Sequence, residues 1–597
     1  MSEHTWTHEQ VVAIRSETDT LLEASAGTGK TTTVVGKILW QLGLDSGMAQ
    51  ENGELVPRCT DPCELQEIAA ITFTDKGARD LKRQLRVAIE DSARADELRW
   101  QIDRAYIGTI HGYCGRLLRE NALIFNIDPT FEQLDEFQAR VEQDRIIEDV
   151  VLRSLQAGET HTESLLGELG NLHGRGRAKG VIDHIRDTVH ELRWRAEFYS
   201  KWSDGKRLRS GHLRKLSRDF GEKDMRVLHR CDELFRLAKA VLPQWDEFLV
   251  AENARDFDSL ILELHKQLHA SENASALEKI RRRYRLLIID EFQDTDVAQR
   301  DIAFAIGHGQ TRPQLFFVGD PKQSIYAFRG ADIAVWNSTK TALADSGSIL
   351  KLSGNFRCAP PIVNFVNITS ETAMGETGQA LDADLAKARI QYSGLKAVRG
   401  DSSHSSVEWL RPDGELGRRK MLMGEFRDRQ AAQVATRIQQ LIETGQVHEK
   451  ETDKPRKCEL RDIAILYRAR TGLESFTDKF DRYEIPHHVT GVRGLAKTQE
   501  ALDLINALRL LNNPHDDRRA FAFLRSPFVC LRDEVIARLR LLSTEENAPL
   551  LTQAARFLGD VDSWPSAPEH ERLGAIEKES LRRGLRVIRD LRDLVHR

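Results

Sequence analysis

The sequence predicts an α/β fold built around a parallel sheet. Short apolar runs of strand length recur along the chain, and amphipathic helical patterns alternate with them. A glycine-bearing loop follows the first of these runs directly. Strands that alternate with helices form parallel sheets, which bind ligands at the carboxyl ends of their strands. The runs are DTLLEA (19–24), IAAITFT (68–74), YIGTI (106–110), LLII (286–289), QLFFVGD (314–320) and ILKL (349–352).

Length and composition narrow the class of protein. A chain of 597 residues is too long for one hydrophobic core, so we expect several domains. Its 40% hydrophobic and 30% charged residues are typical of a folded, soluble protein. Neither a membrane-length apolar run nor a secretory signal is visible, and seven cysteines do not make a disulfide framework in so long a chain. We therefore expect a cytoplasmic protein without membrane attachment.

The charge pattern leaves two interpretations open. A net charge of −5 argues against a protein that binds nucleic acid through its overall charge. Two local basic clusters stand out, one between Lys201 and Arg218 and one between Arg281 and Arg285. Each cluster either faces a phosphate backbone or forms a solvated helical face.

The stretch ASAGTGKTTT, residues 24–33, nearly matches the phosphate-binding pattern G-x-x-x-x-G-K-[ST], with Ala24 in place of the first glycine. An apolar strand precedes it and a helical pattern follows it, so backbone N–H groups can converge on an anion. Ala24 is tolerable if its backbone needs no positive φ. Lys30 is expected to reach the terminal phosphates, and the Thr31 hydroxyl to bind Mg²⁺. The predicted ATP-binding residues of this loop are Ala24, Ser25, Ala26, Gly27, Thr28, Gly29, Lys30, Thr31 and Thr32.

An acidic segment supplies the second half of such a site. In YRLLIIDEFQDTD, residues 284–296, a continuous apolar run reads as a buried parallel strand and ends in Asp290 and Glu291. Asp290 is the predicted Mg²⁺ ligand. Glu291 is predicted to orient or deprotonate the attacking water. ATP and Mg²⁺ are therefore the expected cofactors.

The motifs also form an ordered set. The chain resembles superfamily 1 DNA helicases of the UvrD/RecB type, and looks closest to the RecB/AddA branch. The matching segments are THEQ (7–10), ASAGTGKT (24–31), ITFTDKGARDLKRQL (71–85), GTIHGYCGRLLRE (108–120), NARDFDSLI (253–261), DEFQDT (290–295), GDPKQSIYAFRGAD (319–332), LSGNFRCAPPIVNFVN (352–367), DIAILYRAR (462–470) and IPHHVTGVRGLAKTQEALDLINALRLLNNP (485–514).

The resemblance implies further nucleotide contacts. Gln10 is similar to the glutamine that reads adenine, and Phe356 would stack near the base. Gln323 would sense the γ-phosphate, and Arg357 would reach it from a second lobe. The catalytic residues that the resemblance implies are Lys30, Glu291, Gln323 and Arg357.

The resemblance also implies a path for single-stranded DNA. Tyr326 and Phe328 would stack on bases, while Thr74, Thr109 and His111 would lie along the strand. An aromatic pair spaced i, i+2 is more often core, but this pair sits in a polar loop, which favours stacking. His111 could equally be a hydrogen-bonded structural histidine. Stacking accepts RNA as well as DNA, and the resemblance alone favours single-stranded and duplex DNA.

The implied architecture is two RecA-like motor lobes of the P-loop NTPase type with helical insertions. We expect the second lobe to be incomplete, with strands at VEWL (407–410), DIAILY (462–467) and HHVTG (487–491). The expected segments are the first lobe (1–120 and 280–352), a DNA-contacting helical insertion (121–279), the incomplete second lobe (353–527) and the start of a truncated second helical insertion (528–597).

The function that the resemblance implies is an ATP-dependent DNA helicase moving 3′ to 5′ in repair or recombination, with a partner subunit like those of RecBCD or AddAB. We find no T-x-H-x-x-K-G-L-E-like segment and no nuclease constellation, which leaves two interpretations open: a fragment of a longer protein or a truncated gene product. The alternative is a truncated module that binds ATP and DNA without productive unwinding. A small-molecule phosphotransferase is a third reading, and the aromatic segment GDPKQSIYAF argues against it.

Overall fold

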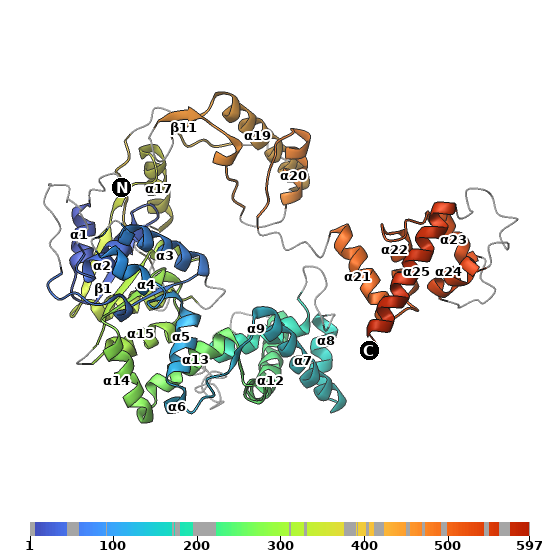
Figure 1. Ribbon diagram of the computed structural model, residues 1–597, viewed down its shortest axis with the longest axis horizontal. Coiled ribbons are helices and arrows are strands. Elements are labelled where there is room, and N and C mark those ends of the chain that lie inside the picture. The colour runs from blue at the N-terminus through green and yellow to red at the C-terminus, as the bar shows by residue number, and fades with distance from the viewer. Residues whose placement is uncertain are drawn as a thin grey trace. The chain divides into compact units, whose positions relative to one another are not determined.

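The chain falls into two compact units, Met1–Glu408 and Trp409–Arg597, which are described separately (Figure 1). The computed structural model describes residues 6–44, 59–90, 92, 94–169, 172, 179–194, 222–309, 312–326, 331–374, 390, 392–400, 405–410, 423–448, 454–467, 472–490, 498–541, 549–559 and 574–595.

A six-stranded parallel sheet organises the first unit, in the order β3-β2-β6-β7-β1-β8. The predicted α/β class is confirmed, and the six predicted strand segments all lie in this one sheet. The strands are β1 (Thr20–Ala24), β2 (Ile68–Thr72), β3 (Tyr106–Thr109), β6 (Leu286–Ile289), β7 (Gln314–Gly319) and β8 (Ser348–Leu352).

The sheet is buried on both faces because alternate residues of each strand enter different cores. Leu21 and Leu287 belong to one core, whereas Leu22 and Leu286 belong to the other. The first core is covered by α5 (Ile110–Glu120), α13 (Phe257–His269), α14 (Ala274–Arg283), α15 (Val297–Gly307) and α16 (Ile333–Leu343). The second is covered by α1 (His8–Arg15), α2 (Lys30–Gln41), α3 (Asp75–Glu90) and α4 (Ala95–Gln101).

The strand register positions the candidate site. Ile71 pairs with Ile289, and Leu22 pairs with Val318. The carboxyl ends of neighbouring strands therefore meet at one edge of the sheet. The first residues after the carboxyl ends of five strands, β1, β2, β3, β6 and β7, are Ser25, Phe73, Ile110, Asp290 and Asp320.

A helical segment with its own hydrophobic core lies between β3 and β6 in the sequence. Near its two ends in sequence, strand β4 (Glu132–Gln133) pairs in parallel with strand β5 (Ala254–Arg255). Its predicted basic stretch from Lys201 to Arg218 lies outside the described residues. The elements are α6 (Ala122–Phe125), β4 (Glu132–Gln133), α7 (Glu136–Gln156), α8 (Thr160–Leu169), α9 (Val181–Trp194), α12 (Glu222–Ala251) and β5 (Ala254–Arg255).

The remaining elements form smaller clusters. The first unit ends with β9 (Gly354–Asn355), α17 (Pro360–Met374) and β10 (Lys396–Ala397). In the second unit, one core joins α19 (Met423–Thr444) and α20 (Leu473–Arg482), beside the antiparallel strands β11 (Gln446–His448) and β12 (Pro455–Lys457). Another joins α21 (Gln499–Asn512), α22 (Asp517–Arg525), α23 (Asp533–Leu541), α24 (Leu550–Gly559) and α25 (Ala575–Val595). This core spans the boundary predicted at residue 527, and the five predicted segments stay predictions.

The three strands predicted for the second lobe are not formed in the described residues. Segments 407–410, 463–467 and 487–490 carry no strand, and residue 491 lies outside the described part. Ile463 is extended, with φ −107° and ψ 126°, yet Leu466 is 95% exposed. An apolar extended segment becomes a strand only when a neighbour accepts and donates its ladder hydrogen bonds. The sequence pattern predicted the conformation of Ile463 but could not supply that neighbour.

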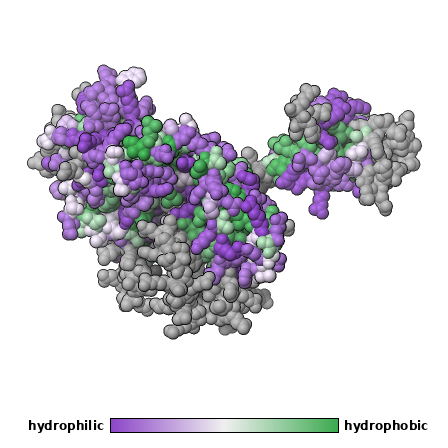
Figure 2. Space-filling view, turned by 90° about the horizontal axis from the view of Figure 1, so that it is seen from below, coloured by the Kyte–Doolittle hydropathy of each residue, from purple (hydrophilic) through white to green (hydrophobic). Residues whose placement is uncertain are grey.

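Among the coloured residues on the face seen in Figure 2, hydrophilic ones predominate, and hydrophobic residues gather in smaller patches between them. Within the described ranges, no helix combines the length and apolar character that crossing a bilayer requires.

Candidate functional site

The loop after β1 has the backbone that its sequence predicted. Ala24 is a buried strand residue outside the positive-φ region, so its methyl group replaces the expected glycine without strain. Gly27 and Gly29 have φ of 82° and 81°, a left-handed conformation that favours glycine. The Thr28 hydroxyl donates to the Ser25 carbonyl at 2.7 Å and closes the turn.

Helix α2 presents a bare N-terminus. It begins at Lys30 behind Gly29, and no side chain caps it. Thr31 and Thr32 lie in its first turn, half-exposed. Uncapped N–H groups and the positive end of the helix dipole attract an anion such as a phosphate.

Gln10 brings a buried amide to this loop. Its backbone and side chain form a capping box with Thr7, in which the Gln10 Oε1 atom accepts the Thr7 N–H at 3.2 Å. The Nε2 atom is buried and, among the described residues, has no hydrogen-bond partner. A Cβ atom on Gly29 would stand 2.6 Å from Nε2. A buried amide donor beside the bare helix end fits a ligand with a nitrogen or oxygen acceptor, as an adenine base has.

The acidic pair predicted at the end of β6 meets the lysine of the loop. The Lys30 Nζ atom lies 2.5 Å from Glu291 Oε2 and 3.9 Å from Asp290 Oδ1. Glu291 has a φ of 55°, rare for a residue with a side chain. Burial raises the pKa of the Asp290 carboxyl to about 6, against the lowering effect of the Lys30 charge.

These residues fit a magnesium ion held jointly with a nucleotide. Carboxylate and hydroxyl oxygens are the hard donors that Mg²⁺ prefers, and Asp290 and Thr31 supply one of each. The described residues contain no group of three or more His, Cys, Asp or Glu side chains able to hold a metal by themselves. A site with few protein ligands is what Mg²⁺ needs when phosphates and water complete its coordination.

The segment 354–358 is docked on the loop. The Asn355 Nδ2 atom donates to the Ala26 carbonyl at 2.8 Å, and the Phe356 N–H donates to the Gly27 carbonyl at 2.8 Å. Phe356 and Arg357, predicted to contact the nucleotide, are thereby brought to the loop, both exposed. Sequence reasoning missed Asn355, although the Gly-Asn pair before the predicted residues pointed to a turn.

The turn after β7 carries the predicted sensor Gln323. Helix η4 (Pro321–Gln323) begins behind Asp320, whose Oδ2 atom accepts the Gln323 Nε2–H at 2.7 Å. The Lys322 Nζ atom lies 3.0 Å from both Asp320 Oδ1 and Glu23 Oε1. Asp320 and Lys322 were not singled out from the sequence, because nothing in it shows that Glu23 is their neighbour.

The predicted nucleic-acid contacts line the same edge of the sheet. Tyr326 is half-buried, and its ring centroid lies 4.8 Å from that of Phe73. Neither ring belongs to a hydrophobic core of the described residues. Thr74 is exposed, and its hydroxyl accepts the Gly77 N–H at 3.0 Å at the start of α3. Phe328 lies outside the described residues.

Thr109 and His111 continue this edge at β3 and α5. The Thr109 hydroxyl caps α5 by accepting the Gly112 N–H at 3.4 Å. The His111 ring meets the Phe257 ring edge-on, with centroids 5.1 Å apart. Phe257 is 39% exposed and was not predicted as a contact. The two threonines thus have local structural roles, and the DNA contacts stay predictions.

The described basic cluster is engaged within the protein. Arg281 donates to the Ala305 carbonyl at 2.8 Å, and Arg282 pairs with Glu278 at 3.1 Å. Arg283 pairs with Glu120, and Arg285 pairs with Asp61. These contacts favour a structural role for this cluster over binding of a phosphate backbone.

Two family models match the chain. The UvrD/REP helicase N-terminal domain matches residues 6–343, and the UvrD-like helicase C-terminal domain matches residues 350–547. Curated relatives include an ATP-dependent helicase/nuclease subunit of Exiguobacterium sibiricum, 23% identical, with 96% of this chain and 58% of that protein covered. The protein of the same name from Lysinibacillus sphaericus is 22% identical, with 99% and 58% covered.

The RecBCD enzyme subunit RecB of Escherichia coli is 26% identical, with 83% of this chain and 50% of that protein covered. The chain thus spans between half and three fifths of the length of these relatives. The first family model alone covers more than half of the chain, and it includes the phosphate-binding loop and the acidic strand. The chain therefore belongs to the UvrD/REP helicase family.

Proposed function

We propose that the protein is an ATP-dependent DNA helicase that couples ATP hydrolysis to 3′-to-5′ movement on single-stranded DNA in repair or recombination. The observation that carries the proposal is the meeting of Lys30 with Glu291 and Asp290 at the bare end of α2. Phosphoryl transfer from a nucleoside triphosphate requires three parts: a lysine on the loop, a pair of acidic side chains, and a helix end that binds an anion.

In the proposed reaction, a water oxygen forms a bond to the γ-phosphorus while the bond from that phosphorus to the β–γ bridging oxygen breaks. Glu291 accepts the proton of the water, and ADP leaves with the bridging oxygen. Lys30 and Arg357 would neutralise charge on the transferring group, and Gln323 would sense it. Thr31 and Asp290 would hold a magnesium ion, which would supply further positive charge to the phosphates.

Nucleic acid would lie across the strand ends next to this site. Tyr326 against Phe73, together with Phe328, offers rings on which bases can stack. Such stacking contributes about 1–3 kcal/mol per base and reads no sequence. Thr74, Thr109 and His111 would follow the strand. We propose single-stranded and duplex DNA as the substrates, because the motifs that the chain shares with UvrD/RecB-type helicases imply them.

Two further proposals rest on the relatives. RecB is named as one subunit of the RecBCD enzyme, and the other relatives are named as one subunit of a helicase/nuclease, so we propose a partner subunit for this protein. We also propose that it works in the cytoplasm, where such an ATP-driven enzyme meets DNA in a bacterium.

The direct test is ATP hydrolysis with and without single-stranded DNA. Lys30→Ala is expected to lower DNA-stimulated kcat by roughly a hundredfold or more, because it removes a charge aimed at the transferring phosphate. Lys279→Ala, at an exposed lysine on α14, is the matched control and should hydrolyse ATP like the wild type. Hydrolysis that ignores single-stranded DNA, or that survives Lys30→Ala, contradicts the proposed function.

We propose as a second candidate function a module that binds ATP and DNA without productive unwinding, because segments 407–410, 463–467 and 487–490 form no strand with any described residue. Strand separation on duplexes with a 3′ or a 5′ tail distinguishes the two. Unwinding from the 3′ tail supports the helicase and its polarity. DNA-stimulated hydrolysis without strand separation supports the module.

A further inference from the structure

The 3-10 turn η3 (Phe292–Asp294), which follows Glu291 directly, carries a buried glutamine that the proposed reaction does not use. Gln293 is 3% exposed. Its Nε2 atom donates to Glu291 Oε2 at 2.8 Å, and its Oε1 atom accepts the Asp320 N–H at 2.9 Å. Because an amide both donates and accepts, this one side chain ties the end of β6 to the end of β7.

Gln293 and Lys30 hold the same carboxylate oxygen. The Lys30 Nζ atom donates to Glu291 Oε2 at 2.5 Å, beside the amide at 2.8 Å. If Lys30 turned to a bound triphosphate, Gln293 would still bind Oε2, and the amide would orient the Glu291 carboxylate without the lysine.

The other end of Gln293 leads to the nucleic-acid edge. Asp320, whose N–H Gln293 accepts, also binds the Gln323 Nε2–H through its side chain. Asp294, next to Gln293, lies close to the backbone N–H of Ile325, the neighbour of Tyr326; this N–H lowers the pKa of the Asp294 carboxyl against the larger raising effect of burial. The η3 turn is thus hydrogen-bonded to Asp320 at one end of the 320–326 turn and lies beside the residue that precedes the stacking ring at the other.

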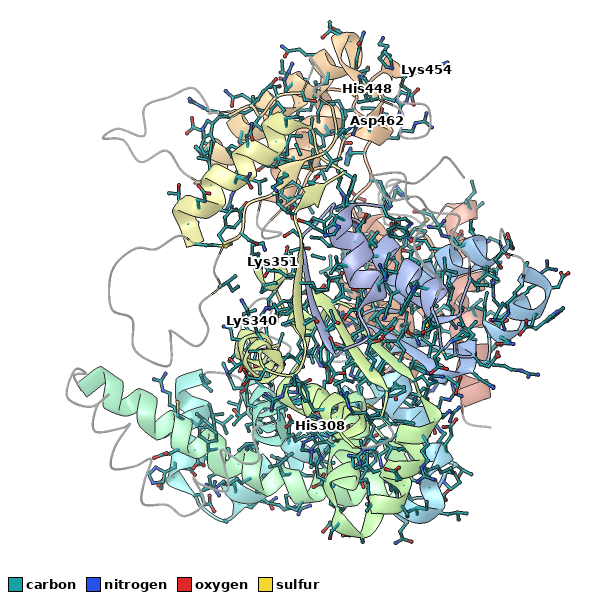
Figure 3. All side chains as sticks on the ribbon, turned by 90° about the vertical axis from the view of Figure 1, so that its left-hand side faces the viewer. His308, Lys340, Lys351, His448, Lys454 and Asp462 are labelled. Atoms are coloured by element: carbon teal, nitrogen blue, oxygen red, sulfur yellow. The ribbon has the colours of Figure 1, made fainter. Side chains whose placement is uncertain are left out.

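The 320–326 turn also has space on one side. A cavity of 630 Å³ is lined by Pro321 of this turn, by Lys340 on α16 and by Lys351 on β8 (Figure 3 labels both lysines). Pro321 is the residue of the turn that borders this space, so a displacement of the turn at Pro321 toward the cavity meets no packed side chain.

We propose that Gln293 is a positioning residue through which occupancy of the Tyr326 site controls the orientation of Glu291. The inference rests on the proposed function and adds to it the route by which DNA stimulates hydrolysis. A base stacked on Tyr326 moves the 320–326 turn, the Asp320 N–H moves with it, and the Gln293 amide turns Glu291. Gln293 touches neither nucleotide nor DNA in this scheme.

The test compares two variants that act on the same amide from opposite sides. Gln293→Met keeps the side-chain volume and removes the hydrogen bonds to Glu291 and Asp320, together with a longer one of 3.4 Å to Asp294. Gly319→Ala leaves Gln293 in place but puts a methyl group 2.4 Å from its Oε1 atom, so the amide must move. If Gln293→Met fails to fold, Gly319→Ala still tests whether Gln293 connects Asp320 to Glu291.

The matched control is Gln314→Met, at the opposite end of β7. The Gln314 Nε2 atom donates to the carbonyls of Ser16 and Thr18 at 2.9 and 2.6 Å. This variant also deletes glutamine hydrogen bonds on β7, but far from Glu291. It therefore measures how much a general loss of stability alone changes the stimulation of hydrolysis.

Hydrolysis is measured with and without saturating oligothymidylate, along with KM for ATP and Kd for the oligonucleotide. Gln293→Met and Gly319→Ala should each lower the ratio of stimulated to unstimulated kcat by about tenfold, while KM and Kd stay within about threefold of the wild type. Gln314→Met should keep the wild-type ratio.

Three results overturn the inference. They are an unchanged ratio in both test variants, an equal loss of ratio in Gln314→Met, and a loss of oligonucleotide affinity that accounts for the lost stimulation. A wild-type protein that DNA does not stimulate overturns the proposed function itself. A stimulated wild type with equally stimulated variants overturns only the role of Gln293.

Discussion

At the scale of single residues, Gly27 shows why the loop needs glycine at a position where the sequence pattern leaves the residue free. Its φ is 82°, and a Cβ atom there would stand 2.8 Å from the Cβ atom of Arg357 and 2.9 Å from Asn355 Nδ2. A side chain at position 27 is thus excluded for two separate reasons: the left-handed backbone conformation, and the close approach of segment 354–358. The packing of this segment on the loop depends on Gly27 for both reasons.

Gly27→Ala is expected to combine strain with a clash and to displace Asn355 from the Ala26 carbonyl. We expect it to lower stability by more than the ~1–2 kcal/mol of left-handed strain and to lower kcat for ATP by about tenfold. Gly158→Ala is the control, because Gly158 has φ 72° and no atom within 4 Å of the added methyl group. Equal effects of the two substitutions on thermal unfolding and hydrolysis would show that the contact with segment 354–358 has no consequence.

Lys37 on α2 provides a second prediction at this scale. It is fully buried beneath Trp40 and donates to the Ser16 carbonyl at 2.5 Å. Burial lowers its pKa from the ordinary 10.5 to about 8. Between these pH values the unfolded chain keeps a proton that the folded protein has lost, so stability rises with pH across this window.

Lys37→Met should abolish that rise and stabilise the protein at pH 7 by on the order of 2 kcal/mol. The Ser16 carbonyl keeps the Gln314 Nε2–H as a partner at 2.9 Å, so no acceptor is orphaned. Urea unfolding at pH 7.5 and pH 10 measures the effect. A wild-type stability that is flat or falling between these two pH values contradicts the assigned burial of charge.

The residues that the sequence predicted and those it missed differ in the separation of their partners. Lys30, Asp290 and Glu291 stand at characteristic places in short local patterns, so each could be named without knowing its neighbours. Asn355 donates a hydrogen bond to the Ala26 carbonyl, 329 residues away in sequence, and Gln293 accepts one from the Asp320 N–H, 27 residues away. No local spacing predicts such partners.

At the scale of elements, α9 is fastened to the start of α13 by a buried ion pair. Arg193 donates to Asp256 at 2.6 and 3.0 Å and to the Ser259 hydroxyl at 2.9 Å, with 8% of its side chain exposed. Asp256 also caps α13 by accepting the Ser259 N–H at 2.8 Å. One carboxylate therefore starts a helix and anchors its neighbour.

Arg193→Met should destabilise the protein by about 3–5 kcal/mol, because it leaves the Asp256 charge buried without its cation. Arg145→Met serves as the control, since Arg145 is 61% exposed and pairs with Glu142 on its own helix. That surface pair contributes about 1 kcal/mol or less. Chemical unfolding of both variants gives the comparison, and similar losses would refute an anchoring role for Arg193.

Elements also differ in how well sequence patterns predict them. The six strands of the first sheet were predictable because each is a continuous apolar run whose partners lie in the same unit. Of the three strands expected in the second lobe, only the segment 462–467 contains such a run, and none of the three has a ladder partner among the described residues. Apolar periodicity reports a preference for burial, whereas a strand also requires a second strand beside it.

At the scale of the whole molecule, the proposed nucleotide-binding and catalytic residues lie in the first unit, from Gln10 to Arg357. The nucleotide contacts therefore need only one unit to form. Under the proposed function, strand separation would require cycles of movement between two lobes. Hydrolysis and unwinding therefore need separate measurements.

The order of strands in the sheet has a consequence for synthesis on the ribosome. β1 has β7 and β8 as its two neighbours, and the hydrogen bond from the Leu315 N–H to Asp19 spans 296 residues. At roughly 5–20 residues per second, the nascent β1 waits about 15–60 s for a partner. Throughout that interval the N–H and C=O groups of β1 lack both ladder partners, so a chaperone that shields the emerging strand would raise the share of chains that reach the native state.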